Sequence, residues 1–183
     1  SNLSLVISGT MKKLFFLIFT FLSLNTAVFG FTMPARSTAG AESVIPYIID
    51  SDFKTALNSI DSMIRIDSED PFPYILKLTA LGMRDIDFDR TIDSAAFLST
   101  YQKAIDCSNK LESTSGKTSY SRMMVGLCKV MHASFYLRNK AYFAAMQNGF
   151  DALDILDEAR KIDSSNTEVL MFLGMYDFAR AEL

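Results

Sequence analysis

Apolar residues recur at intervals of three and four along most of the chain, beginning near Ile45. In the stretch "DFKTALNSIDSMIRI" the stripe consists of Phe53, Ala56, Leu57, Ile60, Met63 and Ile64. This spacing is typical of an amphipathic helix that turns one face to a core. Ser51 or Asp52 can cap the start of the helix. The "DSEDPFP" stretch ends it, because proline cannot continue a helix interior.

Similar stripes predict further helices, separated by short polar breaks. They lie in "YILKLTALGM", "SAAFLSTYQKAIDCSNKLE", "YSRMMVGLCKVMHASFYLRN", "AYFAAMQNGFDALDILDEARKI" and "TEVLMFLGMYDFARAEL". In the last break, Ser165 and Glu168 fit a capping box, with Ser165 as the cap and Glu168 reaching back. No segment alternates with the period of a strand, so the sequence predicts an all-α fold.

Two helix–break–helix passages resemble each other: "SMIRIDSEDPFPYILKLTALG" and "ARKIDSSNTEVLMFLGMYDFA". Aligning Asp67 with Asp163 also aligns Ala56 with Ala152, because both pairs are 96 residues apart. A helix–break–helix unit that recurs along a chain, here with an aspartate in each break, indicates a helical repeat array.

At these residues the chain resembles the tetratricopeptide repeat (TPR) family, whose unit is two antiparallel helices of about 34 residues. Ala152, Leu156 and Ala159 fall where that family has a small, a bulky and a second small residue in its second helix. Leu173 and Gly174 fall at its Leu-Gly pair. The resemblance implies antiparallel helix-turn-helix repeats, stacked as a short TPR-like solenoid over residues 43–183.

The chain also departs from the family pattern. Ser68 and Ser164 replace the usual proline, and an offset of 96 is not a multiple of 34. The region "MMVGLCKVMHASFYLRNKAYFAAMQNGFDAL" is similar to one found in exported bacterial repeat proteins. The middle of the array is therefore expected to be irregular.

The repeat model assigns two kinds of position. Small residues let helix backbones approach closely, and large ones fill the space beside them. The expected packing positions are Ala56, Ala152, Leu156, Ala159, Leu173 and Gly174, and Gly126 joins them if it marks a helix crossing. Stacked hairpins leave a groove that suits peptides or partner helices. The groove face is expected to carry Glu168, Met171, Met175 and Phe178.

The N-terminal segment reads as an export signal. Residues 11–30 begin with Met-Lys-Lys, continue with an apolar run and end in small residues, which is the layout of a secretory signal peptide. Cleavage is expected after Gly30, with Ala39-Gly40-Ala41 as a later alternative. Residues 1–10 are expected to be upstream sequence, and residues 31–42 a flexible linker. The alternative is an uncleaved anchor in the inner membrane.

The chemistry of the chain points away from catalysis. The formal net charge of −3 and the lack of a Lys/Arg cluster argue against a nucleic-acid partner. His132 is the only histidine and is expected to be structural. In an exported protein, Cys107 and Cys128 are expected either to form a disulfide or to remain two buried thiols. No catalytic residue, metal site or cofactor is expected.

Two functions follow from these observations. The first is a non-catalytic protein- or peptide-binding scaffold of the bacterial cell envelope, periplasmic or secreted. The alternative is a membrane-anchored structural subunit of an envelope or uptake complex. The chain stops at Leu183, within or just after the first helix of a repeat. We therefore expect either that the natural protein continues or that residues 167–183 mediate self-association.

Overall fold

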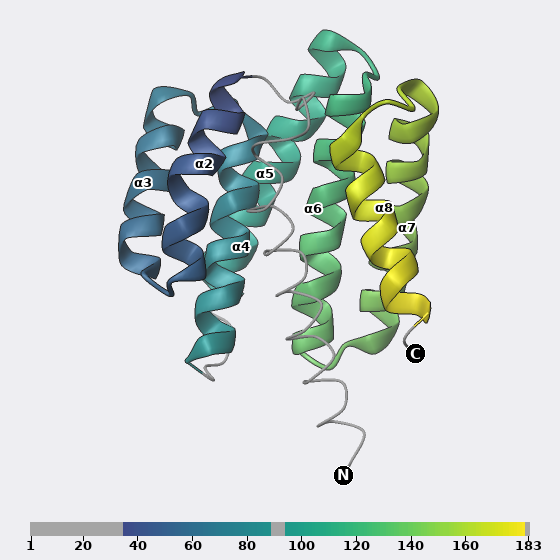
Figure 1. The fold of residues 1–183 in the computed structure, drawn as a ribbon. Coiled ribbons are helices and arrows are strands. Elements are labelled where there is room, and N and C mark those ends of the chain that lie inside the picture. Colours follow the sequence, from purple (N-terminus) through teal and green to yellow (C-terminus); the bar gives the residue numbers. More distant parts are fainter. Residues whose placement is uncertain (1–34, 89–93, 182–183) are drawn as a thin grey trace.

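The structure, a computed structural model, describes residues 35–88 and 94–181. Every regular element in this part is an α-helix, so the all-α prediction is confirmed (Figure 1). The expected upstream residues 1–10, the signal peptide 11–30 and linker residues 31–34 lie outside the described part.

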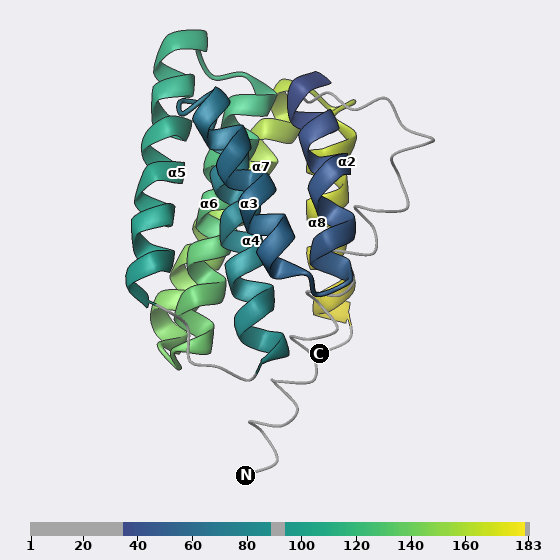
Figure 2. The same cartoon turned by 90° about the vertical axis from the view of Figure 1, so that its left-hand side faces the viewer.

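The described residues form seven helices. These helices stand side by side, and successive helices run antiparallel (Figures 1 and 2). They are α2 (Ala35–Ile49), α3 (Phe53–Ile66), α4 (Pro71–Asp87), α5 (Ser94–Ser115), α6 (Ser119–Arg138), α7 (Tyr142–Ile162) and α8 (Thr167–Ala181).

The prediction of a flexible linker at residues 31–42 is wrong for residues 35–42, which form the first half of α2. Ser37 and Ala41 are buried on the same helix face as Val44. The small residues that look like a linker allow close packing instead, since a Cβ added at Gly40 would meet the side chain of Met63. The helical domain therefore begins by residue 35 and not at residue 43.

The helix starts explain the offset of 96 residues. Helices α4, α6 and α8 begin at residues 71, 119 and 167, so the two intervals are each 48 residues. The buried alanines of α3, α5 and α7, which are Ala56, Ala104 and Ala152, are spaced in the same way. Midway between Asp67 and Asp163 the chain has Ser115, so an alignment on the aspartates shows the interval of 96 residues and not the interval of 48.

The helices pack in a regular order. Each helix contacts the next one along the chain, and α4 also contacts α2 and α6. The even-numbered helices α2, α4 and α6 thus form a row, with α3 and α5 joining its successive members. The pair of α6 and α7 has the most extensive contact among the described helices.

The α6/α7 contact depends on one glycine. A Cβ added at Gly126 would lie 2.9 Å from both Cγ and Cδ2 of Leu156 and 3.3 Å from Cγ2 of Ile155. Only glycine leaves room for these side chains, so Gly126 does mark a helix crossing. Ala152, Leu156 and Ala159 are buried as the repeat model expects.

Gly174 contradicts the repeat-packing prediction. It is exposed, and a Cβ added there would meet nothing within 4 Å. Leu173, its neighbour, is partly buried against the core. The Leu-Gly pair therefore supplies only one packing residue, because no described helix covers the glycine side of α8.

Candidate functional site

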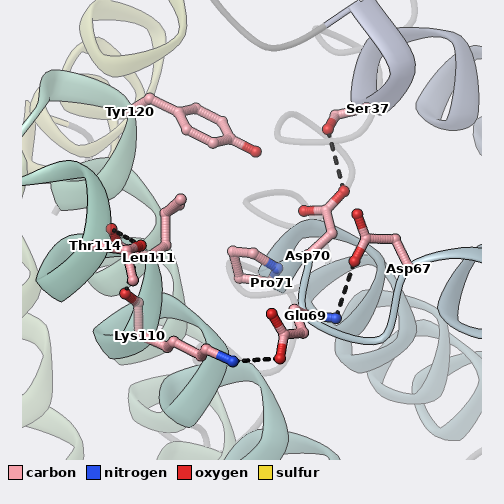
Figure 3. Close-up of a pocket in the computed structure, with 9 residues that line it drawn as sticks. All are labelled: Ser37, Asp67, Glu69, Asp70, Pro71, Lys110, Leu111, Thr114 and Tyr120. Atoms are coloured by element: carbon pink, nitrogen blue, oxygen red, sulfur yellow. Dashed lines mark hydrogen bonds and ion pairs between the residues drawn. The ribbon is translucent and has the colours of Figure 1, made fainter.

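A cavity of about 360 Å³ opens where the ends of four helices meet. Its walls come from the start of α2, the loop before α4, the end of α5 and the start of α6 (Figure 3). The lining residues are Ser37, Asp67, Glu69, Asp70, Pro71, Lys110, Leu111, Thr114 and Tyr120. The set combines apolar walls with several hydrogen-bonding groups, as ligand pockets do.

The loop before α4 owes its shape to two aspartates. Asp67 Oδ1 accepts a hydrogen bond from the backbone N–H of Glu69 at 3.1 Å, which forms a tight turn. Asp70 caps α4 by accepting the N–H of Phe72 at 3.0 Å, and Pro71 takes the first helical position. These local bonds fix one wall of the cavity.

Two contacts tie that wall to other helices. The Ser37 hydroxyl of α2 donates to Asp70 Oδ2 at 3.3 Å. Lys110 of α5 forms an ion pair with Glu69 at the rim (Figure 3). Both members of this pair are largely exposed, so it contributes little to stability. It does place one charge of each sign at the mouth of the cavity.

Tyr120 is the unusual member of the lining. Its hydroxyl is buried and makes no hydrogen bond within the described residues. Figure 3 shows this hydroxyl directed toward Ser37 and Asp70. Burial raises the pKa of Tyr120, and the charge of Asp70 adds to the rise. A buried hydroxyl without a partner is costly, so a ligand that bonds with it would gain free energy.

A second cluster surrounds His132. Its ring stacks on Tyr101 with centroids 4.1 Å apart and lies 4.4 Å from the ring of Tyr136. Burial raises the pKa of Tyr101 to about 12. Burial, together with the charge of Lys129, lowers the pKa of His132, while Asn148 opposes this shift. The surroundings favour the neutral imidazole and make it part of an aromatic packing cluster.

This lowered pKa predicts a loss of stability in mild acid. Below about pH 6.5 the unfolded chain takes up a proton at His132 that the folded chain resists. The free energy of unfolding should therefore fall as the pH drops from about 7 toward the lowered pKa. Urea unfolding at several pH values measures this. His132→Phe keeps an aromatic ring and should lose this part of the slope; an unchanged slope would contradict the prediction.

Of the two alternatives expected for the cysteines, the structure shows free thiols and not a disulfide. Cys128 is buried, and its Sγ lies 3.5 Å from the hydroxyl of Ser108. Cys107 points elsewhere and contacts the carbonyl oxygen of Ser68 at 3.5 Å. Neighbouring residues of a helix differ in direction by about 100°, so Ser108 takes the place that pairing would require of Cys107.

Thiol labelling tests whether the two thiols are free. Burial raises the pKa of Cys128 to about 12, and it also raises the pKa of the more accessible Cys107. Because the thiolate is the reactive form, native protein should label slowly, at Cys107 first. Protein unfolded without a reductant should label at both positions. Labelling of neither position after such unfolding would show that the disulfide forms.

The expected groove face on α8 is not borne out at Glu168, which is only 4% exposed. Its carboxylate accepts a hydrogen bond from the Thr167 hydroxyl. The expected cap at Ser165 is also wrong, because the side chain that accepts the backbone N–H of Val169 is that of Asn166. Asn166 caps α8 instead. Met171 and Met175 are partly buried, and the side chain of Phe178 lies outside the described part.

The cavity residues were not identified from the sequence. Ser37, Asp70 and Tyr120 lie far apart along the chain, and no local motif joins them. The one available signal was Asp70-Pro71, which has the form of a helix cap followed by a first-turn proline. That signal locates the start of a helix and says nothing of a cavity.

Within residues 35–88 and 94–181, no three His, Cys, Asp or Glu side chains are placed to hold a metal ion. No helix in this part combines the length and apolar character needed to span a bilayer. We compared the chain with protein-family models, with curated proteins and with solved structures, and none of the three comparisons finds a match.

Proposed function

We propose that this chain is a non-catalytic scaffold of the bacterial cell envelope that binds a protein or peptide through TPR-like helix pairs. The observation that carries the proposal is the 48-residue spacing of α4, α6 and α8, matched by the alanines of α3, α5 and α7. The pairs are α2/α3, α4/α5 and α6/α7, and α8 begins a further unit. Repeated helix pairs of this kind form extended binding surfaces.

The interval of 48 residues is longer than the TPR unit because the helices themselves are longer. Helices α5, α6 and α7 have 22, 20 and 21 residues, whereas two helices and their turns fit within about 34 residues in the TPR family. Longer helices lengthen the repeat without changing the order in which helices pack. The contacts of α4 with both α2 and α6 support this reading.

The cavity is the proposed peptide site. Pro71 and Leu111 offer apolar walls, and Tyr120 offers a buried hydroxyl that can donate or accept one hydrogen bond. A peptide side chain with a polar end matches this combination. The exposed Lys110–Glu69 pair at the rim can be displaced at small cost because its solvated charges interact weakly.

Selection of displayed random peptides on the full chain tests this site. Selected peptides should bind the parent chain and lose at least about tenfold in affinity, or about 1.4 kcal/mol, when Leu111→Trp fills the cavity. Tyr120→Phe should weaken binding of polar-ended peptides only. Asp154→Ala, on the exposed face of α7, serves as the control. The proposal fails if no peptide binds above a scrambled sequence, or if Leu111→Trp has no effect.

The export part of the proposal predicts a defined N-terminus. Cleavage after Gly30 keeps all of α2, whereas cleavage after Ala41 would remove the buried Ser37 and Ala41. The chain recovered from the envelope of a bacterial host should therefore begin at Phe31. Intact-mass measurement checks this. A retained apolar segment would instead favour the membrane-anchored structural subunit.

A further inference from the structure

The first half of α7 carries an exposed apolar surface. Its side chains are those of Tyr142, Phe143, Met146 and Phe150, which are 54%, 76%, 51% and 55% exposed. The exposed positions in the second half of the same helix are mostly charged and include Asp154 and Glu158. On the exposed side of α7, apolar and charged residues are thus separated along the helix axis. The apolar part adjoins the turn between α6 and α7, which lies at one end of the bundle (Figures 1 and 2).

The turn beside this surface is basic. Residues 113–150 contain five Lys or Arg residues and no Asp or Glu, in a chain whose formal net charge is −3. Two of the five, Arg138 and Lys140, lie at the turn itself. Arg138 donates a hydrogen bond to the carbonyl oxygen of Asp85 at 3.3 Å, and Lys140 is exposed. Aromatic and cationic side chains that are exposed together are typical of a surface that meets the headgroups of a bilayer.

The backbone fixes Lys140 at the tip of the turn. Its N–H donates to the carbonyl oxygen of Leu137 at 3.1 Å, and the N–H of Ala141 donates to the carbonyl oxygen of Tyr136 at 2.9 Å. These two bonds close α6 in the Schellman arrangement, with Lys140 at a φ of 60°. Glycine is favoured at such a position, so the lysine costs stability. Costly backbone conformations of this kind gather at functional sites.

We infer that the α6–α7 turn and the first half of α7 form a peripheral binding surface for an anionic phospholipid bilayer. Residues 142–150 span about 12 Å of helix, which is close to the roughly 5–10 Å that apolar helix faces enter the interface. Lys140 meets the lipid phosphates, and the acidic second half of α7 stays in water. A partner protein could use the whole exposed side of α7, whereas a flat bilayer reaches only the end of the bundle.

The lipid contact is separate from the proposed peptide site. Tyr120 lies at the start of α6 and Lys140 just past its end, so the cavity and the turn are about 30 Å apart. Asp50 and Asp87 lie at the ends of α2 and α4, which confines the contact with an anionic surface to the α6–α7 turn. A chain held in this way keeps its cavity at the end away from the bilayer.

A single tryptophan tests the inference, because the chain contains none. Phe143→Trp is the probe, and Ile162→Trp, at the far end of α7 and 49% exposed, is its matched control. Vesicles of phosphatidylcholine and phosphatidylglycerol should shift the emission of the probe to shorter wavelength, and brominated lipid should quench it. The control should show neither effect. This local signal is valid whether or not the N-terminal segment also binds lipid, and circular dichroism checks that both variants fold.

Lys140→Gly tests the charge. In the Phe143→Trp chain it relieves the positive φ and removes the cation, so the fold should not lose stability and the same shift should need about fivefold more anionic vesicles. Vesicles of phosphatidylcholine alone should show no such difference. No shift at residue 143, an equal shift at residue 162, or no effect of Lys140→Gly overturns the inference. A shift that grows with protein concentration in the absence of vesicles overturns it in favour of a second copy. Peptide binding at the cavity tests the scaffold function separately.

Discussion

Gly126→Leu is expected to lower the free energy of unfolding by about 1–3 kcal/mol, because it overpacks the crossing of α6 and α7. A Cβ at residue 126 would already lie 2.9 Å from Leu156, so either the helices separate or the side chains leave their preferred rotamers. Chemical denaturation of the parent and variant chains measures the difference.

Two further variants test the cause. Gly174→Leu makes the same change 48 residues later, where an added Cβ meets nothing, and helix propensity should make it neutral or stabilising by up to about 1 kcal/mol. Leu156→Ala should cost less in the Gly126→Leu chain than in the parent, because it vacates the space that the new leucine needs. Equal losses for the two glycine variants would show that the α6/α7 crossing is looser than described.

Asn166→Ala is expected to cost about 2 kcal/mol of stability, the sum of a lost helix cap and a lost buried hydrogen bond. Asn166 is 1% exposed; its Oδ1 accepts the N–H of Val169 at 3.0 Å, and its Nδ2 donates to the Ser119 hydroxyl at 2.9 Å. The residue thus starts α8 and fastens it to α6. Thermal or urea unfolding, followed by circular dichroism, measures the loss.

Ser165 and Ser119 provide the controls. Ser165→Ala should change stability by less than about 0.5 kcal/mol, because Ser165 is exposed and its hydroxyl donates to Asp163 Oδ1 within the same loop. Ser119→Ala removes the hydrogen bond and keeps the cap, so it should cost about half as much as Asn166→Ala. If Ser165→Ala were the more harmful change, the capping box predicted from the sequence would be correct.

Helices and their breaks could be predicted from the sequence because an apolar stripe and a helix cap are both local signals. The apolar stripe of α3 and the aspartate cap before it lie within one short stretch, and Asp52 does cap that helix, through the N–H of Thr55. Helix α2 was missed for a local reason as well. Its first half is rich in small residues and has no stripe of large apolar residues. Burial of these small residues depends on the packing of α2 against α3 and α4.

The remaining errors concern neighbours that no short stretch of sequence specifies. Gly126 and Gly174 occupy equivalent helix positions, yet only the first is covered by another helix. Cys107 and Ser108 are neighbours on α5, and the orientation of that helix about its axis decides which of them faces Cys128. Tyr120 becomes a cavity residue only because α2 brings Ser37 beside the start of α4.

The order of packing also bears on how the chain folds. Substantial contacts in the described part join helices that are successive or next but one, so the polypeptide loops that must close are short. Chains with such local topology fold quickly, since little entropy is lost before contacts form. Among the described helices, α2 has substantial contacts with α3 and α4, and α8 has them with α7. Terminal helices can therefore open while α4 and α6, each held on both sides, keep their amide protons from exchanging with solvent.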